Sequence, residues 1–444
     1  MNEQVKDWKA VDVARIDPAE ARGTPVDKAP TPDLGTALIP KGRYTSHEFM
    51  DLEWQRLWRK VWNLAGPEQL LEEPGDYFTT ELGGESFIIV KQADATYKGF
   101  FNVCRHRGNR LCLPGAHGQA ASFRCQYHHW EWNPDGTVKN IPDPESFSQG
   151  LPYDKLGLRQ VRVDRWGGLI WFTMDPQAEP LADYLGVIPE HLDPYHFERQ
   201  RLTKNVTIEW DCNWKTSVDA FNETYHVQGI HPELMSWLDD YHVQIDCYDR
   251  HNRYLVPFTT PSPRYQDRES LSPEMQFMLS EVGLDPSDFD GRPLDVRRAI
   301  QQAKRAKENA VIFPYRELND DQLSDDYHYM IFPNVTMNIY AESMMLFRSR
   351  PHPSDPNRMF FDLMNFAHLP DDADLPPPEH KTYKHGQYSL GLVLDQDAYN
   401  LPGVQAGMNS ESYDGLYIGD QELRIRHFHK TLMDYVDPDG GLGL

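Results

Sequence analysis

Two short cysteine and histidine pairs constrain the fold of this chain more than any other feature. Cys104 and His106 lie in the run CRHRG, and Cys125 and His128 lie in the later run CQYHH. Thiolates and imidazoles are good ligands for zinc and iron, and two such pairs this close together are rare by chance. Each pair lies between short strand-like runs, so the sequence predicts two metal-binding loops in a β-rich unit.

Three interpretations of the two pairs remain open on the residues alone. The four side chains can be ordinary core cysteines and surface histidines, without a metal. They can hold a structural zinc ion with two thiolates and two imidazoles. Zinc fingers, however, usually place two like ligands on each loop, whereas each loop here offers one cysteine and one histidine. That mixture suits a [2Fe-2S] cluster in which two thiolates bind one iron and two imidazoles bind the other.

Composition narrows the class of protein. The 444 residues are enough for two or three domains. A net charge of −24 argues against nucleic acid or an anionic membrane as a partner. The chain has no apolar run long enough to predict a membrane span, and its first residues lack the apolar stretch of a secretory signal. The odd number of five cysteines favours a reducing cytoplasm over a disulfide framework.

The pattern of residues predicts an α+β protein with an arm and two domains. Residues 1–40 are polar and predict an extended N-terminal arm. Short β-rich runs predict a small all-β domain over 41–175, with a leading helix over 46–62. Residues 176–444 mix helical runs with strand-like runs and predict a larger domain with an antiparallel sheet. The charged stretch 262–325 within it is expected to be a lid or an insert.

A second pair of histidines, His226 and His231, lies in the run NETYHVQGIHPEL. Residues five apart on a continuous helix point in directions about 140° apart, so both can reach one ion only if the helix breaks between them. Gly229 and Pro232 predict that break. Such a pair alone is structural at least as often as it is metal-binding. A carboxylate would complete the triad of two histidines and one acid that binds non-haem iron.

The first constellation resembles the C-x-H…C-x2-H signature of Rieske proteins in its oxygenase form, on the residues CRHRG and CQYHHWEW. The resemblance implies that Cys104 and Cys125 bind one iron of a Rieske cluster, and that His106 and His128 bind the other. Respiratory Rieske proteins carry two further cysteines that form a disulfide beside the cluster. Tyr127 stands at one of those positions here, so that disulfide is not expected.

Other residues of the same stretch are not expected to be ligands. The spacer between the pairs is slightly longer than is usual in the family, and His129 stands where the family commonly has glycine. Cys112, His117 and His129 are interpreted as bystanders. Arg105, Arg107 and Arg124 belong to a basic island without acidic residues, which predicts either a docking surface for an acidic electron carrier or local stabilisation of the cluster charge.

The second constellation resembles the catalytic-iron motif of Rieske non-haem iron oxygenases, with NWK upstream. The resemblance implies that His226, His231 and an aspartate near the C-terminus bind the mononuclear iron. Asp397 is favoured because it lies eight residues before Gln405, as in the family motif, and Asp395 is its competitor. An ordinary acid in a polar loop is the alternative interpretation for both.

Glu223 lies three residues before His226, and the two are expected to share one helical face. In the resembled family an acid at this position bridges a cluster histidine of one subunit to an iron-ligand histidine of its neighbour. The resemblance therefore implies a homotrimer or an α3β3 assembly in which electrons cross the subunit interface through Glu223. Asp219, one turn earlier, is expected to be a helix-surface acid.

The resemblance covers residues 40–440 and implies a Rieske β domain joined to a helix-grip catalytic domain. Its function would be that of a terminal oxygenase, which passes electrons through the cluster to a mononuclear Fe(II) and activates O2 to hydroxylate or dihydroxylate an aromatic or polycyclic small molecule. Demethylation, or monooxygenation of a quaternary amine, is the alternative within the family. A Rieske electron carrier and a zinc-binding interaction protein are the alternatives outside it.

The electron donor and the substrate pocket are only partly predictable. The chain has no glycine-rich fingerprint of a nucleotide-binding βαβ unit, so no NAD or flavin site is expected. Electrons are therefore expected from a separate reductase or ferredoxin. Met337, Met344, Met345 and Phe347 are candidates for an apolar pocket, although packing in the core is the more common role of such residues.

Overall fold

The chain folds into two units, and the computed structural model describes residues 28–307, 312–370, 372–376 and 378–441. Unit 1 comprises Met1–Asp51, Glu190–Pro351 and Asp355–Leu444, and unit 2 comprises Leu52–Pro189 and His352–Ser354. The predicted arm over 1–40 lies mostly outside the described residues. The predicted domain boundaries after residues 40 and 175 stay predictions.

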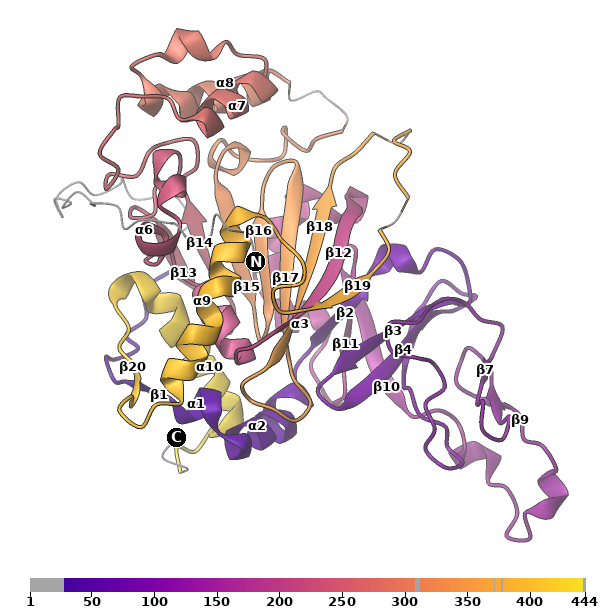
Figure 1. Cartoon of the computed structure of the whole chain (residues 1–444). Helices are drawn as coiled ribbons and strands as arrows, with labels where there is room; N and C mark the ends of the chain where they lie inside the picture. The colour runs from indigo at the N-terminus through magenta and orange to yellow at the C-terminus, as the bar shows by residue number, and fades with distance from the viewer. Residues whose placement is uncertain (1–27, 308–311, 371, 377, 442–444) are drawn as a thin grey trace. The chain divides into compact units, whose positions relative to one another are not determined.

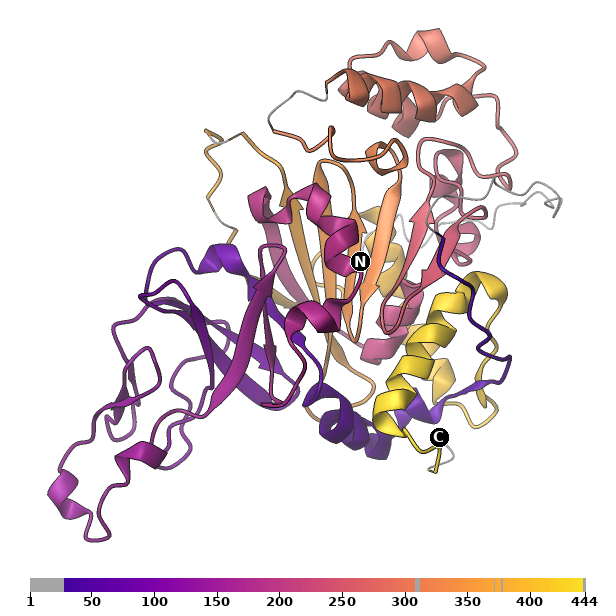
Figure 2. The same cartoon turned by 180° about the vertical axis from the view of Figure 1, so that it is seen from behind.

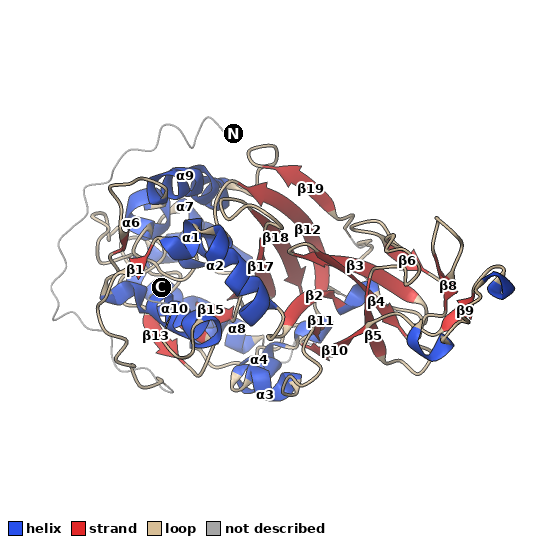
Figure 3. Ribbon diagram, turned by 90° about the horizontal axis from the view of Figure 1, so that it is seen from below, coloured by secondary structure: helices blue, strands red, loops and turns tan. Residues whose placement is uncertain are grey.

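Unit 2 is built mainly of strands and loops, as Figure 3 shows. Glycine turns divide its apolar runs into hairpins. Gly167 and Gly168 both have positive φ, +64° and +69°, which allows the tight turn between strands β10 and β11. The main sheet runs in the order β2 (Asn63–Pro67), β11 (Leu169–Thr173), β10 (Gln160–Trp166), β5 (Tyr97–Phe101), β4 (Glu85–Lys91), β3 (Asp76–Leu82) and β6 (His117–Gln119). A smaller sheet contains β7 (Phe123–Arg124), β8 (Glu131–Trp132) and β9 (Val138–Asn140).

The core of unit 2 includes two of the predicted ligand residues. Cys104 and Cys125 are buried in one apolar cluster with Ile88, Phe100 and Trp132. Burying such side chains stabilises a fold by about 1.5–3 kcal/mol each. The two ligand loops are therefore anchored to the body of the unit at their cysteines.

The predicted leading helix over 46–62 is too long at its C-terminal end. Helix α1 spans Gly42–Thr45, α2 spans His47–Glu53, and a wider turn of π-type helix, η2, continues over Trp54–Trp58. The Asn63 side chain donates hydrogen bonds to the carbonyls of Trp58 and Val61, both at 3.1 Å. These bonds satisfy carbonyl groups at the end of the helix, where strand β2 begins. Ser46 caps the start of α2, because its Oγ accepts from the Phe49 N–H at 3.2 Å.

Unit 1 contains the predicted antiparallel sheet. Its eight strands run in the order β13 (Gln244–Cys247), β14 (Asn252–Val256), β15 (Asp326–Ile331), β16 (Val335–Ile339), β17 (Ser343–Pro351), β18 (Met359–Ala367), β12 (Arg201–Trp210) and β19 (Lys381–Lys384). All neighbours are antiparallel except β12 and β19. Strands β1 (Ile39–Pro40) and β20 (Gly415–Leu416) form a separate pair.

Helices pack against this sheet, so the predicted α+β class is confirmed. Helix α5 (Trp214–Ala220) contacts β17 and α9 (Leu392–Met408), and α10 (Leu423–Val436) contacts β13 and β14 (Figure 1). The short helices α3 (Leu181–Leu185) and α4 (Ile188–Leu192) precede the sheet in the chain. No helix in the described ranges is long and apolar enough to cross a membrane.

The segment 262–325 contains two helices that pack on each other. Helices α7 (Pro273–Glu281) and α8 (Val296–Ala306) share a buried cluster of Met275, Leu279, Val296 and Ile300. Figures 1 and 2 both show them beyond the ends of the strands of unit 1. This position fits a lid or an insert, and that role stays a prediction.

The turn glycine Gly136 provides a test of the packing in unit 2. Its φ is +85°, and a Cβ atom added there would collide with the ring of Phe100. We expect Gly136→Ala to destabilise unit 2 by about 2–4 kcal/mol, because a strained backbone and an overpacked ring both cost energy. Differential scanning calorimetry measures the effect. Gly84→Ala is the matched control, because no atom lies within 4 Å of its added Cβ; equal melting temperatures for the two variants would contradict this packing.

Candidate functional site

His226 and His231 flank one short helix of unit 1. Helix α6 covers only Val227–Ile230, with His226 as its N-cap and His231 as its C-cap. The predicted helix break occurs before Pro232 and not at Gly229, because Gly229 lies inside α6. The helix ends instead at His231, whose φ of −126° and ψ of 50° are not helical and which precedes Pro232. The early end of the helix turns both rings toward the same point.

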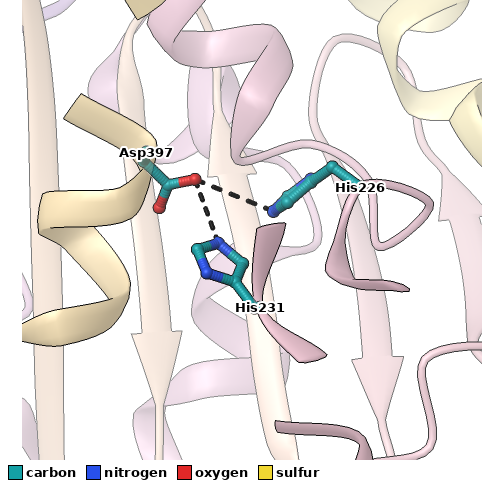
Figure 4. Close-up of side chains that lie close together, drawn as sticks. All are labelled: His226, His231 and Asp397. Atoms are coloured by element: carbon teal, nitrogen blue, oxygen red, sulfur yellow. Dashed lines mark hydrogen bonds and ion pairs between the residues drawn. The ribbon is translucent and has the colours of Figure 1, made fainter. Parts of the chain in front are cut away.

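The third group of this constellation is Asp397, in the middle of α9. Its Oδ1 atom lies 3.1 Å from His231 Nε2 and 3.8 Å from His226 Nε2 (Figure 4). One ligand atom from each of the three residues lies within 4.8 Å of the other two. Asp397 and His231 are only 3% and 1% exposed. A buried carboxylate facing two imidazole nitrogens fits the donor set that binds non-haem iron, so these residues fit the implied ion.

Asp395, the competing aspartate, points elsewhere. Its Oδ2 accepts from the Ser389 hydroxyl at 2.5 Å, and its Oδ1 accepts from the Leu390 N–H at 2.8 Å. These bonds hold the chain at the start of α9. Both aspartates lie in a helix, so the alternative of a polar loop is wrong. The structure therefore places Asp397, rather than Asp395, beside the histidines.

The outer nitrogen of each histidine is held by a second side chain. His226 Nδ1 donates to Glu223 Oε1 at 2.5 Å, and His231 Nδ1 donates to Gln396 Oε1 at 2.6 Å. These bonds keep a ring proton on each Nδ1, so the Nε2 atoms, which face the common point, are the ones that can bind a metal ion. The sequence reasoning did not single out Gln396. Its only signal in the sequence is its position next to Asp397.

The charge around His226 is strongly negative. Burial lowers the pKa of the imidazole, but the carboxylates of Glu223 and Asp397 outweigh burial and raise the pKa to about 9. A metal ion that binds here displaces a proton, and its positive charge then takes over the role of that proton.

Two predictions about the neighbouring acids are wrong. Helix α5 ends at Ala220, so Glu223 and His226 do not share a helical face. Glu223 reaches His226 across a turn instead, and its Oε2 also accepts from the His226 N–H at 2.9 Å. Asp219 is not a surface acid. It is buried and accepts a hydrogen bond of 2.5 Å from the Tyr44 hydroxyl.

The two Cys/His loops of unit 2 have matching backbone geometry. Gly108 N–H donates to the Cys104 carbonyl at 3.1 Å, and His129 N–H donates to the Cys125 carbonyl at 3.0 Å. The donor residue of each loop is left-handed, with φ of +79° at Gly108 and +60° at His129. A position of this kind favours glycine, and His129 adopts it at a cost in conformational energy.

The predicted cluster ligands meet at the tips of these loops. The thiols of Cys104 and Cys125 interact directly. Burial raises the pKa of Cys125, but the N–H groups of Tyr127 and His128 outweigh it and lower the pKa. The ring centroids of His106 and His128 are 4.6 Å apart.

A buried ring nitrogen of His106 indicates that this pair of loops is a binding site. Its ring stacks on Trp130, with centroids 4.8 Å apart and planes at 5°. Its Nδ1 atom is buried and has no hydrogen-bond partner among residues 28–307, 312–370, 372–376 and 378–441. A buried polar atom without a partner costs about 1–3 kcal/mol, and iron at this position would remove that cost. The residues therefore fit the implied cluster.

Two of the predicted bystanders have other contacts. Cys112 packs against the core of unit 2 beside Tyr77, and burial raises its pKa to about 11. His117 is exposed and pairs with Phe78 between strands β6 and β3. The basic residues around the loops, Arg105, Arg107, Arg110 and Arg124, are exposed.

Comparison with known protein families gives two matches. Residues 197–438 match the ring-hydroxylating alpha subunit (catalytic domain), and residues 61–160 match the Rieske [2Fe-2S] domain. The first match contains Glu223, His226, His231 and Asp397. The second contains both Cys/His loops. The cofactors that these domains carry are a Rieske cluster and a mononuclear iron.

Individual relatives fall into two chemical groups. The chain is 29% identical over 225 residues to a glycine betaine monooxygenase oxygenase subunit of Pseudomonas aeruginosa, which covers 50% of this chain and 51% of that protein. It is 35% identical over 190 residues to a benzene 1,2-dioxygenase subunit alpha of Pseudomonas putida, covering 41% and 42%. The chain thus spans about half the length of the curated relatives it matches.

Solved structures show the same fold over nearly the whole chain. The quaternary ammonium Rieske monooxygenase CntA matches with a TM-score of 0.68 and 18% identity, over 93% of this chain and 100% of that one. Naphthalene 1,2-dioxygenase matches with a TM-score of 0.63 and 20% identity, over 90% and 92%.

The two aspartates of α9 allow a matched test of the iron site. We expect Asp397→Asn to lose mononuclear iron, because it removes the charged member of the triad and leaves two neutral imidazoles. Asp395→Asn should keep the iron, since the Asp395 carboxylate accepts its hydrogen bonds from Ser389 and Leu390, before α9. Elemental analysis of both proteins measures the iron, and visible absorption measures the cluster. Iron loss in Asp395→Asn alone would reverse the assignment.

His129 allows a test of the cluster ligands. We expect His129→Gly to keep the cluster and to stabilise the protein by about 1 kcal/mol, because glycine adopts a positive φ without strain. His128→Ala should lose the cluster. Visible absorption per protein chain and thermal melting measure the two effects. If His129→Gly loses the cluster while His128→Ala keeps it, His129 rather than His128 is the cluster ligand.

Proposed function

The chain belongs to the ring-hydroxylating alpha-subunit family, with a Rieske [2Fe-2S] domain before its catalytic domain, and we propose that it is the terminal component of an oxygenase. It takes electrons from a separate reductase or ferredoxin and uses O2 to hydroxylate or dihydroxylate an aromatic or polycyclic small molecule. The observation that carries this proposal is the convergence of His226, His231 and Asp397 on one buried point.

The residues of the chain prepare both sites for this chemistry. When bound, the cluster supplies single electrons, and the mononuclear iron supplies the binding and reduction of O2. Glu223 and Gln396 hold the protons of the two histidines on Nδ1, so that both Nε2 atoms face the iron position. Asp397 offsets the charge of the ion. Three protein ligands leave further coordination positions for small molecules.

A cavity of about 370 Å³ adjoins the triad within unit 1. Its wall includes the metal-site residues together with Phe221, Trp237, Phe258 and Phe347. An apolar wall of this kind holds an aromatic ring and keeps water from the reacting atoms. Met345 and Phe347 line the cavity, whereas Met337 and Met344 are buried outside it. Half of the predicted apolar pocket residues are therefore packed in the core instead.

Glu223 is the proposed bridge for electrons between subunits of a homotrimer or an α3β3 assembly. Each of its carboxylate oxygens accepts one bond from His226 and retains a further lone pair. It can therefore accept an N–H from a cluster histidine of a neighbouring chain, His106 or His128. A carboxylate between two imidazoles fixes both tautomers and couples the electron to a proton.

Two further assignments complete the proposal. The exposed arginines Arg105, Arg107 and Arg124 surround the cluster loops and offer a docking surface to an acidic electron carrier. The cytoplasm is the proposed compartment, because all five cysteines are free thiols.

Monooxygenation of a quaternary amine is the second candidate function. The likeness to a glycine betaine monooxygenase supports it, and so does an aromatic wall in the cavity. The rings of Trp237 and Phe258 lie 5.0 Å apart, and those of Phe258 and Tyr340 lie 5.8 Å apart. Aromatic faces attract quaternary ammonium groups.

Mixed oligomers test the proposed electron path. Cys104→Ser removes a cluster ligand, and Asp397→Asn removes an iron ligand, so each homogeneous protein should be inactive. If electrons cross between chains, co-assembled oligomers should regain activity, since random mixing in a trimer pairs an intact iron with a neighbouring intact cluster at about a quarter of sites. Oxygen consumption with a surrogate reductase and product analysis measure the recovery.

Two controls separate the alternatives. Adding Glu223→Ala to the iron-competent chain should abolish the recovery while both metals stay bound. If the chain were a Rieske electron carrier without oxygenase activity, His226→Ala would not change its reductant-dependent oxygen consumption. Unchanged oxygen consumption in that variant, or no recovery in correctly assembled mixed oligomers, would contradict the proposal.

A further inference from the structure

One face of four neighbouring strands forms a wall of the cavity beside the metal triad. Side chains alternate between the two faces of a strand, so residues two apart share a face. The wall is contributed by Tyr254 and Val256 of β14, Asp326 and His328 of β15, Asn338 and Tyr340 of β16 and its following turn, and Met345 and Phe347 of β17. Most of these side chains are apolar or aromatic, but Asp326, His328 and Asn338 are not. The metal site does not use these three residues.

The position of one proton on His328 follows from its neighbour Arg424. Arg424 is fully buried, and its Nη1 lies 3.1 Å from His328 Nδ1. A guanidinium group can only donate, so Nδ1 accepts and the ring proton lies on Nε2. Burial and the charge of Arg424 lower the pKa of His328 well below its usual range, which keeps the ring neutral. The contact with Arg424 uses Nδ1, so the Nε2–H group of His328, a residue that lines the cavity, remains available to a ligand.

Two more polar groups lie beside that N–H. Asn338 is directly opposite His328 in the pairing of β15 with β16. It is 9% exposed, and its Nδ2 has no partner in the ranges that the structure describes. Asp326 lies two residues before His328, and its Oδ1 accepts from the Ile339 N–H at 3.2 Å. Burial raises the pKa of Asp326 to about 8, so the carboxyl carries a proton at neutral pH and can donate a hydrogen bond.

We propose that Asp326, His328 and Asn338 bind an oxygen atom of the substrate, which makes the substrate an aromatic compound with a hydroxyl, carbonyl or carboxylate oxygen. This proposal rests on the function proposed above, because it takes the cavity as the substrate site. A buried donor without a partner, such as Asn338 Nδ2, is costly, and an acceptor on the ligand removes that cost. The aromatic side chains of the same wall then contact the ring of the substrate.

The same groups disfavour a cationic substrate. The guanidinium of Arg424 lies directly behind His328 and interacts with the Asp326 carboxyl. The N–H of His328 points its positive end at the ligand. A quaternary ammonium group could still contact the aromatic rings, but it offers no acceptor to these donors. The polar wall therefore favours the oxygen-bearing aromatic class over the quaternary amine class.

A series of four ligands of one shape tests the proposal on the intact, metal-loaded protein. Naphthalene, 2-naphthol, 2-naphthoate and (2-naphthyl)trimethylammonium differ only in the substituent. We expect 2-naphthol or 2-naphthoate to bind at least about tenfold more tightly than naphthalene, since one satisfied buried hydrogen bond is worth that ratio. Quenching of tryptophan fluorescence or calorimetry measures the dissociation constants, and the comparison of the two oxygen compounds distinguishes a hydroxyl from a carboxylate.

Variants assign the preference to the polar wall. His328→Phe should remove the preference for the oxygen compounds and leave the affinity for naphthalene within about threefold, because only the hydrogen bond is lost. Asn338→Leu should reduce the preference as a second variant. Met345→Leu alters the same wall without a polar change and should keep the preference, and circular dichroism with metal content confirms folding.

Several outcomes would overturn the proposal. These are equal binding of all four compounds, tightest binding of the ammonium compound, failure of both oxygen compounds to bind, and an equal loss of affinity for every ligand in His328→Phe. Oxygen consumption with naphthalene and a surrogate reductase tests the proposed oxygenase function separately. A protein that oxidises naphthalene without the binding preference keeps its function and loses only the substrate class.

Discussion

Hydrogen bonds to the outer nitrogens of two histidines organise the catalytic unit. Glu223 and Gln396 each accept a hydrogen bond from the Nδ1–H of one histidine, so the Nε2 atoms of His226 and His231 face the Asp397 carboxylate. Without these bonds each ring could turn and present either nitrogen. The arrangement also concentrates negative charge in a buried place, which is unfavourable until a cation enters. The site therefore lowers the stability of the metal-free protein, and binding of a metal ion restores that stability.

The two units position their candidate metal ligands in different ways. In unit 2, two loops with the same backbone turn present one cysteine and one histidine each, and burial of the cysteines fixes both loops on one core. In unit 1, a four-residue helix separates two histidines, and a long helix brings the aspartate to them. Loops tolerate a pair of soft ligands close in sequence, whereas a triad drawn from distant segments needs a rigid sheet behind it.

The cavity beside the triad divides into two chemical environments. Its metal end is rich in carboxylates, and its strand wall offers hydrogen-bond donors from His328 and its neighbours. A ligand held at both ends would have its orientation set by the wall and its reacting bond placed at the ion. Specificity of this kind is stronger than that of an apolar pocket alone, because a ligand without the matching group leaves buried donors unpaired.

The sequence by itself determined the α+β class, the antiparallel strands and the identity of most candidate ligands, because these depend on residue type and short spacing. Only the tertiary structure decided between Asp395 and Asp397, which differ by two residues but face different partners in α9. It also decided the helix end at His231, the turn between Glu223 and His226, and the burial of Asp219. Gln396 and His328 acquire their roles from contacts with His231 and Arg424, which lie 165 and 96 residues away in the chain. Local patterns carry no information about such contacts, since they arise only when distant strands and helices pack.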